Sequence, residues 1–385
     1  MYPDFSYFFH DLFGTPLDNW TQIFKTFGLL LVLAILSASF ILSRELKKMA
    51  DKGVFKAQIV EIVTGKKPKL EDLLVNAVLG FVTGFKGYLV LFDFEFFRKD
   101  PAGAILSSEG NFLMGLLFML IFAGFKYWEL NRKALPKPLV EKKEVFPHHK
   151  IGDITVHAAV FGVIGAKLFA VLETPAEFLE RPLEMLLSGS GLAIYGGLIG
   201  GFFGVRYYLK KNNIPFLHVA DAVAPALFIA YGVGRLGCHF SGDGDWGIVA
   251  AAIPEWWFLP DWLWSYDYPN NVANRGVLME GCDAIYCKRL MPAVYPTPLY
   301  ELVMSFGLAF TLIKIKDRIK VPGMLFAIYL IMNGVERFFI EKIRVNVKYD
   351  WPFGLQPTQA EVISIVFVLL GLLMMFLLKK GKIKV

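Results

Sequence analysis

Apolar residues occur along this chain in runs approaching 20 residues, separated by short polar and often basic connections. A helix rises about 1.5 Å per residue and the hydrocarbon layer of a bilayer is about 30 Å thick, so each such run matches one crossing. The pattern predicts an all-α, polytopic membrane helix bundle, with residues 1–385 forming one membrane domain. Nine spanning helices are expected, at residues 27–43, 73–92, 111–127, 154–172, 191–209, 218–234, 298–313, 321–340 and 361–378.

The composition agrees with this pattern: 55% of the 385 residues are hydrophobic, 15% are aromatic and the mean hydropathy is +0.49. Ordinary soluble domains are less apolar. The net charge of +6 comes without a long basic block or a stacking motif, so no nucleic-acid partner is expected. The first 26 residues lack a basic region ahead of the apolar run and do not resemble a cleaved signal peptide.

Lysine and arginine are distributed unevenly between alternate connections, which indicates the orientation. One set of connections carries 25 of them and the other set 11. Because basic residues are retained on the cytoplasmic side, the N-terminus is expected outside and the C-terminus in the cytoplasm. The second and third helices are the least regular candidates, because Lys86 and Lys126 lie inside them.

Two segments interrupt the helical pattern. Residues 44–153 form a block in which two basic, proline-containing stretches bracket two extra helices. Residues 241–297 form the longest outer connection, an arm or loop rich in aromatic residues. Its large aromatics suit the headgroup layer, either as an interfacial anchor or as a guide for a lipid or peptide; they are Trp256, Trp257, Phe258, Trp262 and Trp264.

The three cysteines give little information about the compartment. Cys282 and Cys287 would lie outside and could be bridged, but their spacing alone leaves both states open. Neither C-x-x-C pairs nor His and Cys clusters occur, so we expect no metal.

Three polar clusters fall on the outer side of the predicted topology. The first is Tyr195 in GLAIYGGLIGG, where Gly196 and Gly197 permit close approach of a helix or lipid chain, although such spacing is also typical of plain helix packing. The second is GRLGCHFSGDGDWG, which places Arg235 beside a glycine-rich turn that can hold an anion. An arginine reaching the headgroups is the simpler alternative there.

The third cluster is NGVERFFIEKIRVN. Arg337, Glu341 and Arg344 follow at i, i+4 and i+7, which predicts one charged helical face pointing to a partner or a wet cavity. A structural Arg–Glu pair between two helices would explain the same pattern. YPTPLYE lies between the second and third clusters; its prolines favour a turn and cap, and the role of Glu301 stays open.

Taken in order, IYGGLIGG, GRLGCHFSGDGDWG, YPTPLYE and RFFIEKIR, with TFGL opening the first helix, resemble the signature blocks of the prolipoprotein diacylglyceryl transferase family. The resemblance covers the first helix and roughly residues 150–378. It implies an enzyme of the bacterial cytoplasmic (inner) membrane, with its active site toward the outer leaflet. Such enzymes move the diacylglyceryl group of phosphatidylglycerol onto the lipobox cysteine of a prolipoprotein signal peptide, and glycerol phosphate leaves.

The matching motifs imply that Arg235 and Arg337 bind phosphate, with Glu341 and Asp243 as supporting acids, while Gly247 closes the signature block. Two departures put the base in doubt: Tyr195 and Phe27 stand where many members have histidine and tyrosine. Cys238 replaces a common asparagine, and the GDGDWG form is one residue longer than the shorter variant.

The reaction is a substitution in which a thiol attacks a glycerol carbon and a phosphate monoester leaves. The thiolate is the nucleophile, so a base is useful, and arginines stabilise the charge that gathers on the phosphate. We therefore expect an arginine clamp, His239 or Glu341 as base, Tyr195 orienting a headgroup hydroxyl, and no cofactor. The expected catalytic residues are Arg235, Arg337, His239, Glu341 and Tyr195, and the expected substrate-binding residues are Arg235, Arg337, Asp243, Gly196, Gly197, Gly237, Tyr300 and Arg344.

Two other classes of protein fit the same features. A transporter or binding protein for an anionic lipid would also need inward arginines and interfacial tryptophans, although its polar groups should lie on both sides of the midplane. An inactive relative that binds phosphatidylglycerol is the other alternative. The sequence leaves open the general base, the acyl-chain preference, the role of residues 44–153 and the oligomeric state.

Overall fold

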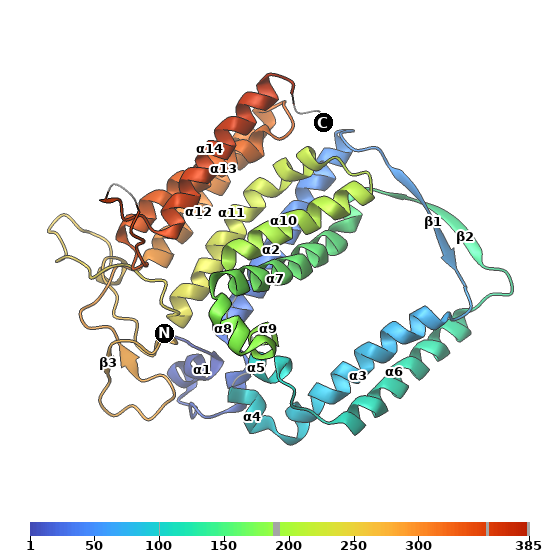
Figure 1. Ribbon diagram of the computed structural model, residues 1–385, viewed down its shortest axis with the longest axis horizontal. Helices are drawn as coiled ribbons and strands as arrows, with labels where there is room; N and C mark the ends of the chain where they lie inside the picture. Colours follow the sequence, from blue (N-terminus) through green and yellow to red (C-terminus); the bar gives the residue numbers. More distant parts are fainter. Residues whose placement is uncertain (100, 188–192, 352–353, 383–385) are drawn as a thin grey trace. The chain divides into compact units, whose positions relative to one another are not determined.

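The computed structural model describes residues 1–99, 101–187, 193–351 and 354–382, which are mostly helical (Figure 1). The chain divides into two compact units. The terminal unit comprises Met1–Met49 and Arg206–Val385, and the middle unit comprises Ala50–Val205. The all-α class predicted from the sequence is confirmed; two short two-stranded ribbons are added to it. The predicted single domain with an inserted block stays a prediction.

The terminal unit contains most of the apolar helices that carry the charged motifs. Its elements are α1 (Phe5–Phe13), η1 (Trp20–Ile23), α2 (Thr26–Asp51), α11 (Phe216–Ser241), η3 (Asp261–Leu263), β3 (Val277–Leu278), β4 (Lys288–Arg289), α12 (Thr297–Ile315), η4 (Lys316–Arg318), α13 (Met324–Ile340), η5 (Glu341–Ile343) and α14 (Gln359–Lys379).

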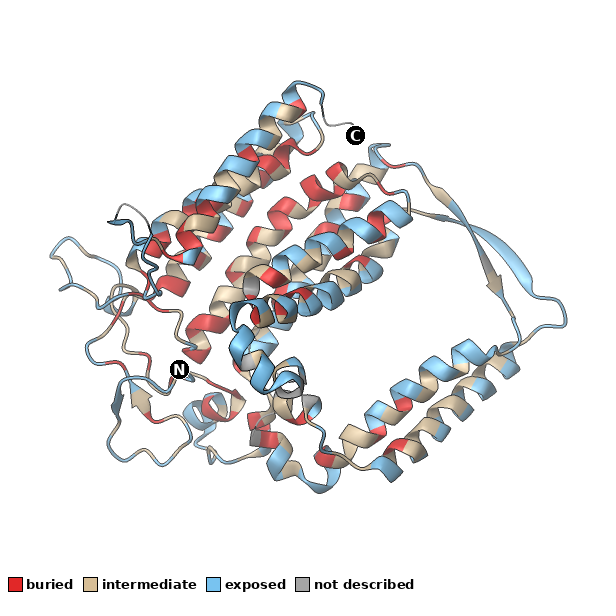
Figure 2. Ribbon diagram, viewed as in Figure 1, coloured by how far each residue is buried: buried red, intermediate tan, exposed pale blue. Residues whose placement is uncertain are grey.

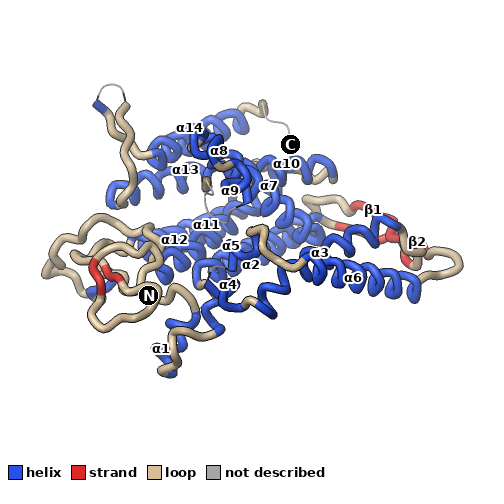
Figure 3. Tube along the Cα trace, turned by 60° about the horizontal axis from the view of Figure 1, so that its bottom comes forward, coloured by secondary structure: helices blue, strands red, loops and turns tan. Residues whose placement is uncertain are grey.

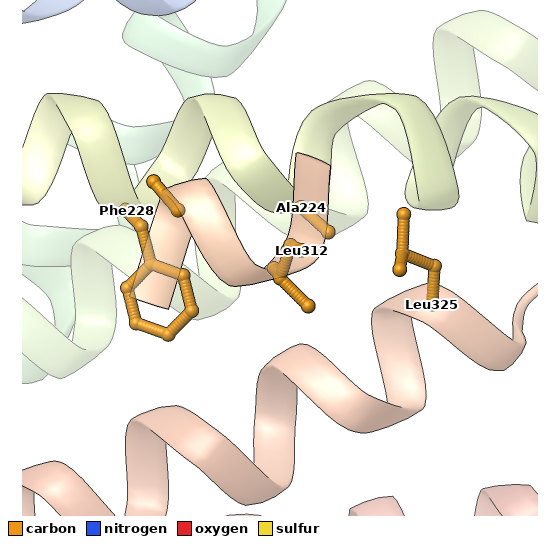
Figure 4. Packing of buried hydrophobic residues seen from close by; sticks show 5 residues of the cluster. Ala224, Phe228, Leu312 and Leu325 are labelled. Carbon is orange, nitrogen blue, oxygen red and sulfur yellow. The ribbon is translucent and has the colours of Figure 1, made fainter. Parts of the chain in front are cut away.

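Helix α11 is the central helix of this unit. In its most apolar stretch 56% of the residues are buried, against 22% in α14, and its buried positions recur along most of its length (Figure 2). Phe228 packs there with Leu312 of α12 and Leu325 of α13, in a cluster completed by Ala224 and Ala309 (Figure 4). The apolar contacts therefore fix α11, α12 and α13 against one another below the charged motifs.

Helices α13 and α14 approach each other closely through two glycines. A Cβ at Gly334 would lie 2.6 Å from the carbonyl oxygen of Ser364, and one at Gly371 would lie 2.8 Å from that of Ala327. Close backbone approach at small residues is the usual way in which membrane helices associate. The α13–α14 pair thus holds the end of α13, where the third charged motif begins.

The connection between α11 and α12 contains little regular structure (Figure 3). Cys282 and Cys287 form a disulfide near the β3–β4 ribbon, with Cα atoms 5.6 Å apart, which answers the question that their spacing left open. Trp256, Trp257 and Trp264 pack edge to face, and Trp256 and Phe258 are also exposed. Exposed aromatic rings of this kind agree with the expected contact with a headgroup layer, which stays a prediction.

The middle unit contains most of the block at residues 44–153 that interrupts the helical pattern of the sequence. Its elements are β1 (Gln58–Thr64), α3 (Leu70–Phe92), α4 (Phe94–Lys99), α5 (Pro101–Leu106), α6 (Phe112–Lys133), β2 (Leu139–Val145), η2 (Pro147–Lys150), α7 (Ile151–Glu173), α8 (Pro175–Glu180), α9 (Pro182–Leu187) and α10 (Ile194–Lys211), whose last six residues belong to the terminal unit. Helices α3 and α6 lie side by side, and β1 and β2 connect them to the rest of the chain as an antiparallel ribbon (Figure 1). Neither strand of this ribbon was predicted from the sequence.

The two lysines that made the second and third helices doubtful both have partners. Nζ of Lys86 donates to the carbonyl oxygens of Ala104, Ser107 and Glu109, at 2.9, 2.5 and 2.8 Å. Lys126 pairs with Glu129 at 3.0 Å. An ammonium group surrounded by carbonyl or carboxylate oxygens is tolerated inside an otherwise apolar helix. Each of the nine predicted segments overlaps one helix, and residues 191–192 of the fifth lie outside the described residues.

Seven helical segments among the described residues are long and apolar enough to cross a membrane, so this is a multi-pass membrane protein. They are Thr26–Asp51, Leu70–Phe92, Phe112–Lys133, Pro147–Glu173, Phe216–Ser241, Thr297–Arg318 and Gln359–Lys379. Two of the nine predicted spans are not among these seven. Helix α13 is short, with 17 residues, and α10 carries three basic residues near its end, Arg206, Lys210 and Lys211. Nine crossings and their orientation stay a prediction.

Candidate active site

The charged motifs of the terminal unit meet in one place. Its members are named here the ion-pair cluster: Arg235, Asp245, Glu301, Arg337, Glu341 and Arg344. They come from the end of α11, the turn that follows it, the first turns of α12, and the end of α13 with the residues beyond it. Helix packing below the cluster therefore brings together segments that are far apart in sequence.

Glu301 is the centre of the cluster. It is fully buried in the second turn of α12, three residues after Pro298. Its Oε1 accepts from Nη1 of Arg344 at 3.0 Å and lies 3.7 Å from Nη1 of Arg337. Its Oε2 pairs with Nε of Arg235 and accepts from the Tyr231 hydroxyl. The residue whose role the sequence left open is thus the one on which all three arginines converge.

Asp245 is the second bridging acid. Its Oδ2 pairs with Arg235 and its Oδ1 accepts from Arg344 at 2.5 Å. Burial alone would raise its pKa, but Arg235 and Arg344 hold the pKa of the Asp245 carboxyl below its ordinary value. Asp243, the expected supporting acid, is exposed and instead accepts from the backbone N–H of Asp245 at 3.1 Å. The ion pairs with the arginines are therefore made by Asp245, and a supporting role of Asp243 stays a prediction.

The prediction that Arg337, Glu341 and Arg344 share one helical face holds for the first two residues and is wrong for Arg344. Nη2 of Arg337 lies 3.1 Å from Oε2 of Glu341, as the i, i+4 spacing requires. However, α13 ends at Ile340, a short η5 follows, and Arg344 has extended backbone. Arg344 reaches the cluster from this extended position and not from a third turn of the helix.

Gly247, which closes the signature block, fixes Arg344 through the backbone. The two residues form an isolated antiparallel bridge, and the N–H of Ile248 donates to the carbonyl oxygen of Ile343 at 2.8 Å. A Cβ at Gly247 would lie 2.7 Å from that same oxygen. Only glycine permits the loop to approach the segment after η5 this closely, which explains its place in the motif.

The cluster is balanced in charge but not saturated in hydrogen bonds. Three arginines face three carboxylates, those of Asp245, Glu301 and Glu341. Among the described residues, Nη1 of Arg337 and Nε of Arg344 are buried without a hydrogen-bond partner. Buried guanidinium donors that remain open are suited to an incoming anion, because phosphate oxygens accept such bonds in pairs.

His239 and Tyr300 lie outside these ion pairs. His239 is buried on α11 and its Nδ1 is 3.2 Å from the Tyr268 hydroxyl, with the Tyr266 and Phe240 rings around it. Tyr300 donates to the carbonyl oxygen of Leu263 at 2.7 Å, which ties η3 to α12. Both residues hold the α11–α12 connection in place, and their expected roles in catalysis and binding stay predictions.

Gly237 lies against α2. A Cβ there would lie 3.2 Å from Cδ2 of Phe27, one of the two departures from the family pattern. Cys238, the free cysteine in this part of the motif, has its Sγ 3.6 Å from Nη1 of Arg235. Phe27 and Cys238 therefore adjoin the glycine and the arginine of the signature block.

Tyr195, Gly196 and Gly197 belong to the middle unit, where α10 packs on α7. A Cβ at Gly196 would lie 2.4 Å from the carbonyl oxygen of Gly165, while one at Gly197 would make ordinary contacts at 3.5 Å and beyond. Gly196 thus serves the helix packing that the sequence offered as the simpler alternative. A direct role of these three residues toward substrate stays a prediction.

One set of donors could bind a cation. Cys238, Asp243 and Asp245 place one ligand atom each within 4.8 Å of one another. The carboxylate of Asp245 is already engaged by two arginines, and their positive charge opposes a metal ion at this point. The arrangement favours anion binding over metal binding.

The sequence alone gave no role to Glu301, Asp245, Tyr231 or Glu336. For the three acids, a carboxylate in or beside one of the quoted blocks was the available signal; Tyr231 carried none. Which of two nearby acids faces an arginine depends on the turn between them, and this is a property of the folded backbone.

Comparison with known proteins matches residues 134–377 to the model of the family "prolipoprotein diacylglyceryl transferase". The chain belongs to this family. The matched range contains every member of the ion-pair cluster, and the resemblance inferred from the motifs is confirmed. With it, the prediction of an enzyme of the transferase class is confirmed.

Individual relatives carry the same name. The phosphatidylglycerol–prolipoprotein diacylglyceryl transferase of Staphylococcus haemolyticus (strain JCSC1435) is 27% identical over 231 residues, which cover 59% of this chain and 72% of the relative. That of Staphylococcus aureus (strain Newman) is 30% identical over 195 residues, covering 50% of this chain and 62% of the relative. The function predicted from the sequence is the one for which these relatives are named.

Proposed function

We propose that this protein transfers the diacylglyceryl group of phosphatidylglycerol to the lipobox cysteine thiol in the signal peptide of prolipoproteins. The family and the names of its relatives support the two substrates. The single observation that carries the proposal is the convergence of Arg235, Arg337 and Arg344 on Glu301. Three guanidinium groups in one buried place form a site for a phosphodiester headgroup.

In this proposal Arg235 and Arg337 hold the phosphate, and Arg344 supports them. The sulfur–carbon bond forms at the glycerol carbon of the diacylglyceryl group as the bond from that carbon to the phosphate oxygen breaks, and the electron pair leaves on that oxygen with glycerol phosphate. The charge gathering on the phosphate is stabilised by donors already in position, where little reorganisation is needed. The open donors of Arg337 and Arg344 supply the first hydrogen bonds to it.

The thiol proton needs an acceptor, for which His239 and Glu341 are the candidates. Glu341 pairs with Arg337 and also accepts from Asn346 at 2.6 Å, so its carboxylate already contacts two neighbours. His239 contacts the Tyr268 hydroxyl through Nδ1 at 3.2 Å and lies outside the ion pairs of the cluster. Both residues therefore stay candidates for the base.

We place this site at the outer leaflet of the bacterial cytoplasmic membrane. The basic residues of the alternate connections and the disulfide Cys282–Cys287 in the α11–α12 connection support this orientation, because disulfides persist in oxidising compartments. In intact cells, a membrane-impermeant maleimide should label Glu255→Cys and spare Lys142→Cys; labelling of Lys142→Cys alone would reverse the orientation.

The activity itself is tested with purified protein, phosphatidylglycerol labelled in its acyl chains and a lipobox peptide. We expect the label on the peptide cysteine and an equal amount of released glycerol phosphate. Retention of the label in bound phosphatidylglycerol would identify an inactive lipid-binding relative. Movement of the label across a vesicle bilayer without peptide modification would identify a transporter.

A further inference from the structure

Glu336 is a buried acid that the proposed chemistry does not use. It lies on α13 with 6% of its surface exposed, and neither of its carboxylate oxygens has a hydrogen-bond partner among the described residues. The three acids of the ion-pair cluster, in contrast, all contact arginines. A buried carboxylate without a partner is costly, so its presence calls for a ligand that supplies one.

The helix geometry places Glu336 beside the cluster. It is seven residues beyond Tyr329, whose ring packs on Phe228 of α11 with centroids 4.8 Å apart. Positions seven apart lie on the same face of a helix, so Glu336 faces α11 two turns above that contact. The charges of Glu301, Arg337 and Arg235 act on its carboxyl group. It therefore borders the place where the arginines converge without forming an ion pair there.

The charge balance of the cluster explains why Glu336 has no partner. Arg235, Arg337 and Arg344 are matched by three carboxylates already, and Glu336 is a fourth. Within the described part of the chain, Glu336 makes no ion pair and no side-chain hydrogen bond. Neutral hydrogen-bond donors on a ligand are the remaining way to satisfy it.

We propose that Glu336 recognises the two adjacent hydroxyl groups of the phosphatidylglycerol headgroup; this rests on the function proposed above. The headgroup glycerol is esterified to the phosphate that the arginines bind, and it ends in a vicinal diol. Two O–H donors match two unpartnered carboxylate oxygens. A protonated carboxyl, with one donor and one acceptor, also pairs with a diol, so the match holds in either protonation state.

Arg337 follows Glu336 directly in the chain. Neighbouring positions on α13 would thus contact the phosphate and the glycerol of one headgroup. A site built to hydrogen-bond a hydroxyl discriminates strongly against an analogue that lacks it, because its polar groups are then left unpaired. Glu336 is accordingly a specificity-determining residue, not a member of the phosphate clamp.

The test compares phosphatidylglycerol with phosphatidylpropanol, which has the same phosphodiester without headgroup hydroxyls, in the peptide transfer assay. For the unmodified protein we expect kcat/KM to be higher with phosphatidylglycerol by roughly ten- to a hundredfold, mainly through KM. Glu336→Ala should lose this preference while its rate with phosphatidylpropanol changes little. Glu336→Gln, whose amide offers a donor and an acceptor, should retain part of the preference.

Glu255→Gln is the matched control, because it removes an exposed carboxylate from the α11–α12 connection. Equal use of both lipids by the unmodified protein would overturn the proposal without any variant, as would an unchanged preference in Glu336→Ala and Glu336→Gln. Failure of the proposed function has a different result: the unmodified protein would transfer label from neither lipid to the peptide.

Discussion

Arg344 donates through Nη2 to Oδ1 of Asp245 at 2.5 Å, although 99 residues separate them in sequence. The same guanidinium reaches Glu301 through Nη1 at 3.0 Å. Arg344 therefore ties the turn after α11 to the beginning of α12, while its own backbone is paired with Gly247. The ion-pair cluster depends on the segment beyond α13 as much as on the helices themselves.

The central place of Glu301 predicts a large effect on stability. Glu301→Gln removes the charge that Arg235, Arg337 and Arg344 share, and leaves three guanidinium groups to the two remaining carboxylates of Asp245 and Glu341. Breaking a buried ion pair from one side costs about 3–5 kcal/mol. We expect a clearly lowered unfolding temperature in detergent solution, measured by tryptophan fluorescence, and little change in Glu255→Gln. Equal unfolding temperatures for the two variants would show that Glu301 does not hold the cluster together.

The phosphate clamp predicts that Arg337 requires a guanidinium and not merely a positive charge. Lysine keeps the charge but has no planar fork, so it cannot replace paired hydrogen bonds to phosphate oxygens. We expect Arg337→Lys to lower kcat/KM for peptide modification by about 10²–10³, comparable to the loss of a preplaced donor at an oxyanion. Arg289→Lys is the control, since Arg289 is half-exposed and 3.8 Å from Asp267. Near-normal turnover in Arg337→Lys would remove Arg337 from the clamp.

The helices could be predicted from the sequence because the length of an apolar run is a strong signal for a crossing. Even Lys86 fits, since its ammonium group is satisfied by carbonyl oxygens from α5 and the residues after it, a partner set that no local pattern reveals. The β1–β2 ribbon was missed because its paired residues are 75 positions or more apart in the sequence. Pairing at this separation leaves no local mark on either strand.

The site was predicted in outline, and its errors have specific causes. The motif spacing placed Arg344 on a helical face, but the helix ends at Ile340 and the chain becomes extended. Asp243 and Asp245 are separated only by Gly244, whose φ of 108° turns the backbone so that Asp245 faces the arginines. Glu301 follows two prolines and therefore resembled part of a helix start. Each of these points concerns a direction of the backbone, which residue types and spacing do not specify.

Asp245 predicts how stability depends on pH. Because its folded pKa lies below the ordinary value of about 3.9, its ion pairs stabilise the protein above that pH, and the contribution is lost as the pH falls through the lower folded value. The gap in unfolding temperature between the unmodified protein and Asp245→Asn should stay constant from about pH 7 to 5 and close below about pH 4. Asp243→Asn should show a smaller gap, since Asp243 forms no ion pair within the described residues. A gap for Asp245→Asn that already closes between pH 7 and 5 would contradict the lowered pKa.

The middle unit predicts a sharp difference between two glycines three residues apart on α10. A Cβ at Gly200 would lie 2.2 Å from the carbonyl oxygen of Phe161 and 2.9 Å from Cα of Gly165, so Gly200→Ala must push α10 and α7 apart. At Gly197 the nearest atom is 3.5 Å away, an ordinary contact that alanine can make.

Since backbone atoms cannot move aside as a flexible side chain can, we expect Gly200→Ala to lower the unfolding temperature by several degrees, consistent with the roughly 1–3 kcal/mol cost of overpacking. Gly197→Ala should change it little. Differential scanning fluorimetry of both variants in the same detergent measures the contrast. The same result would also separate packing from substrate binding: if Gly197→Ala keeps its unfolding temperature but loses transfer activity, the predicted contact of Gly197 with substrate is supported, because stability can then no longer account for the loss.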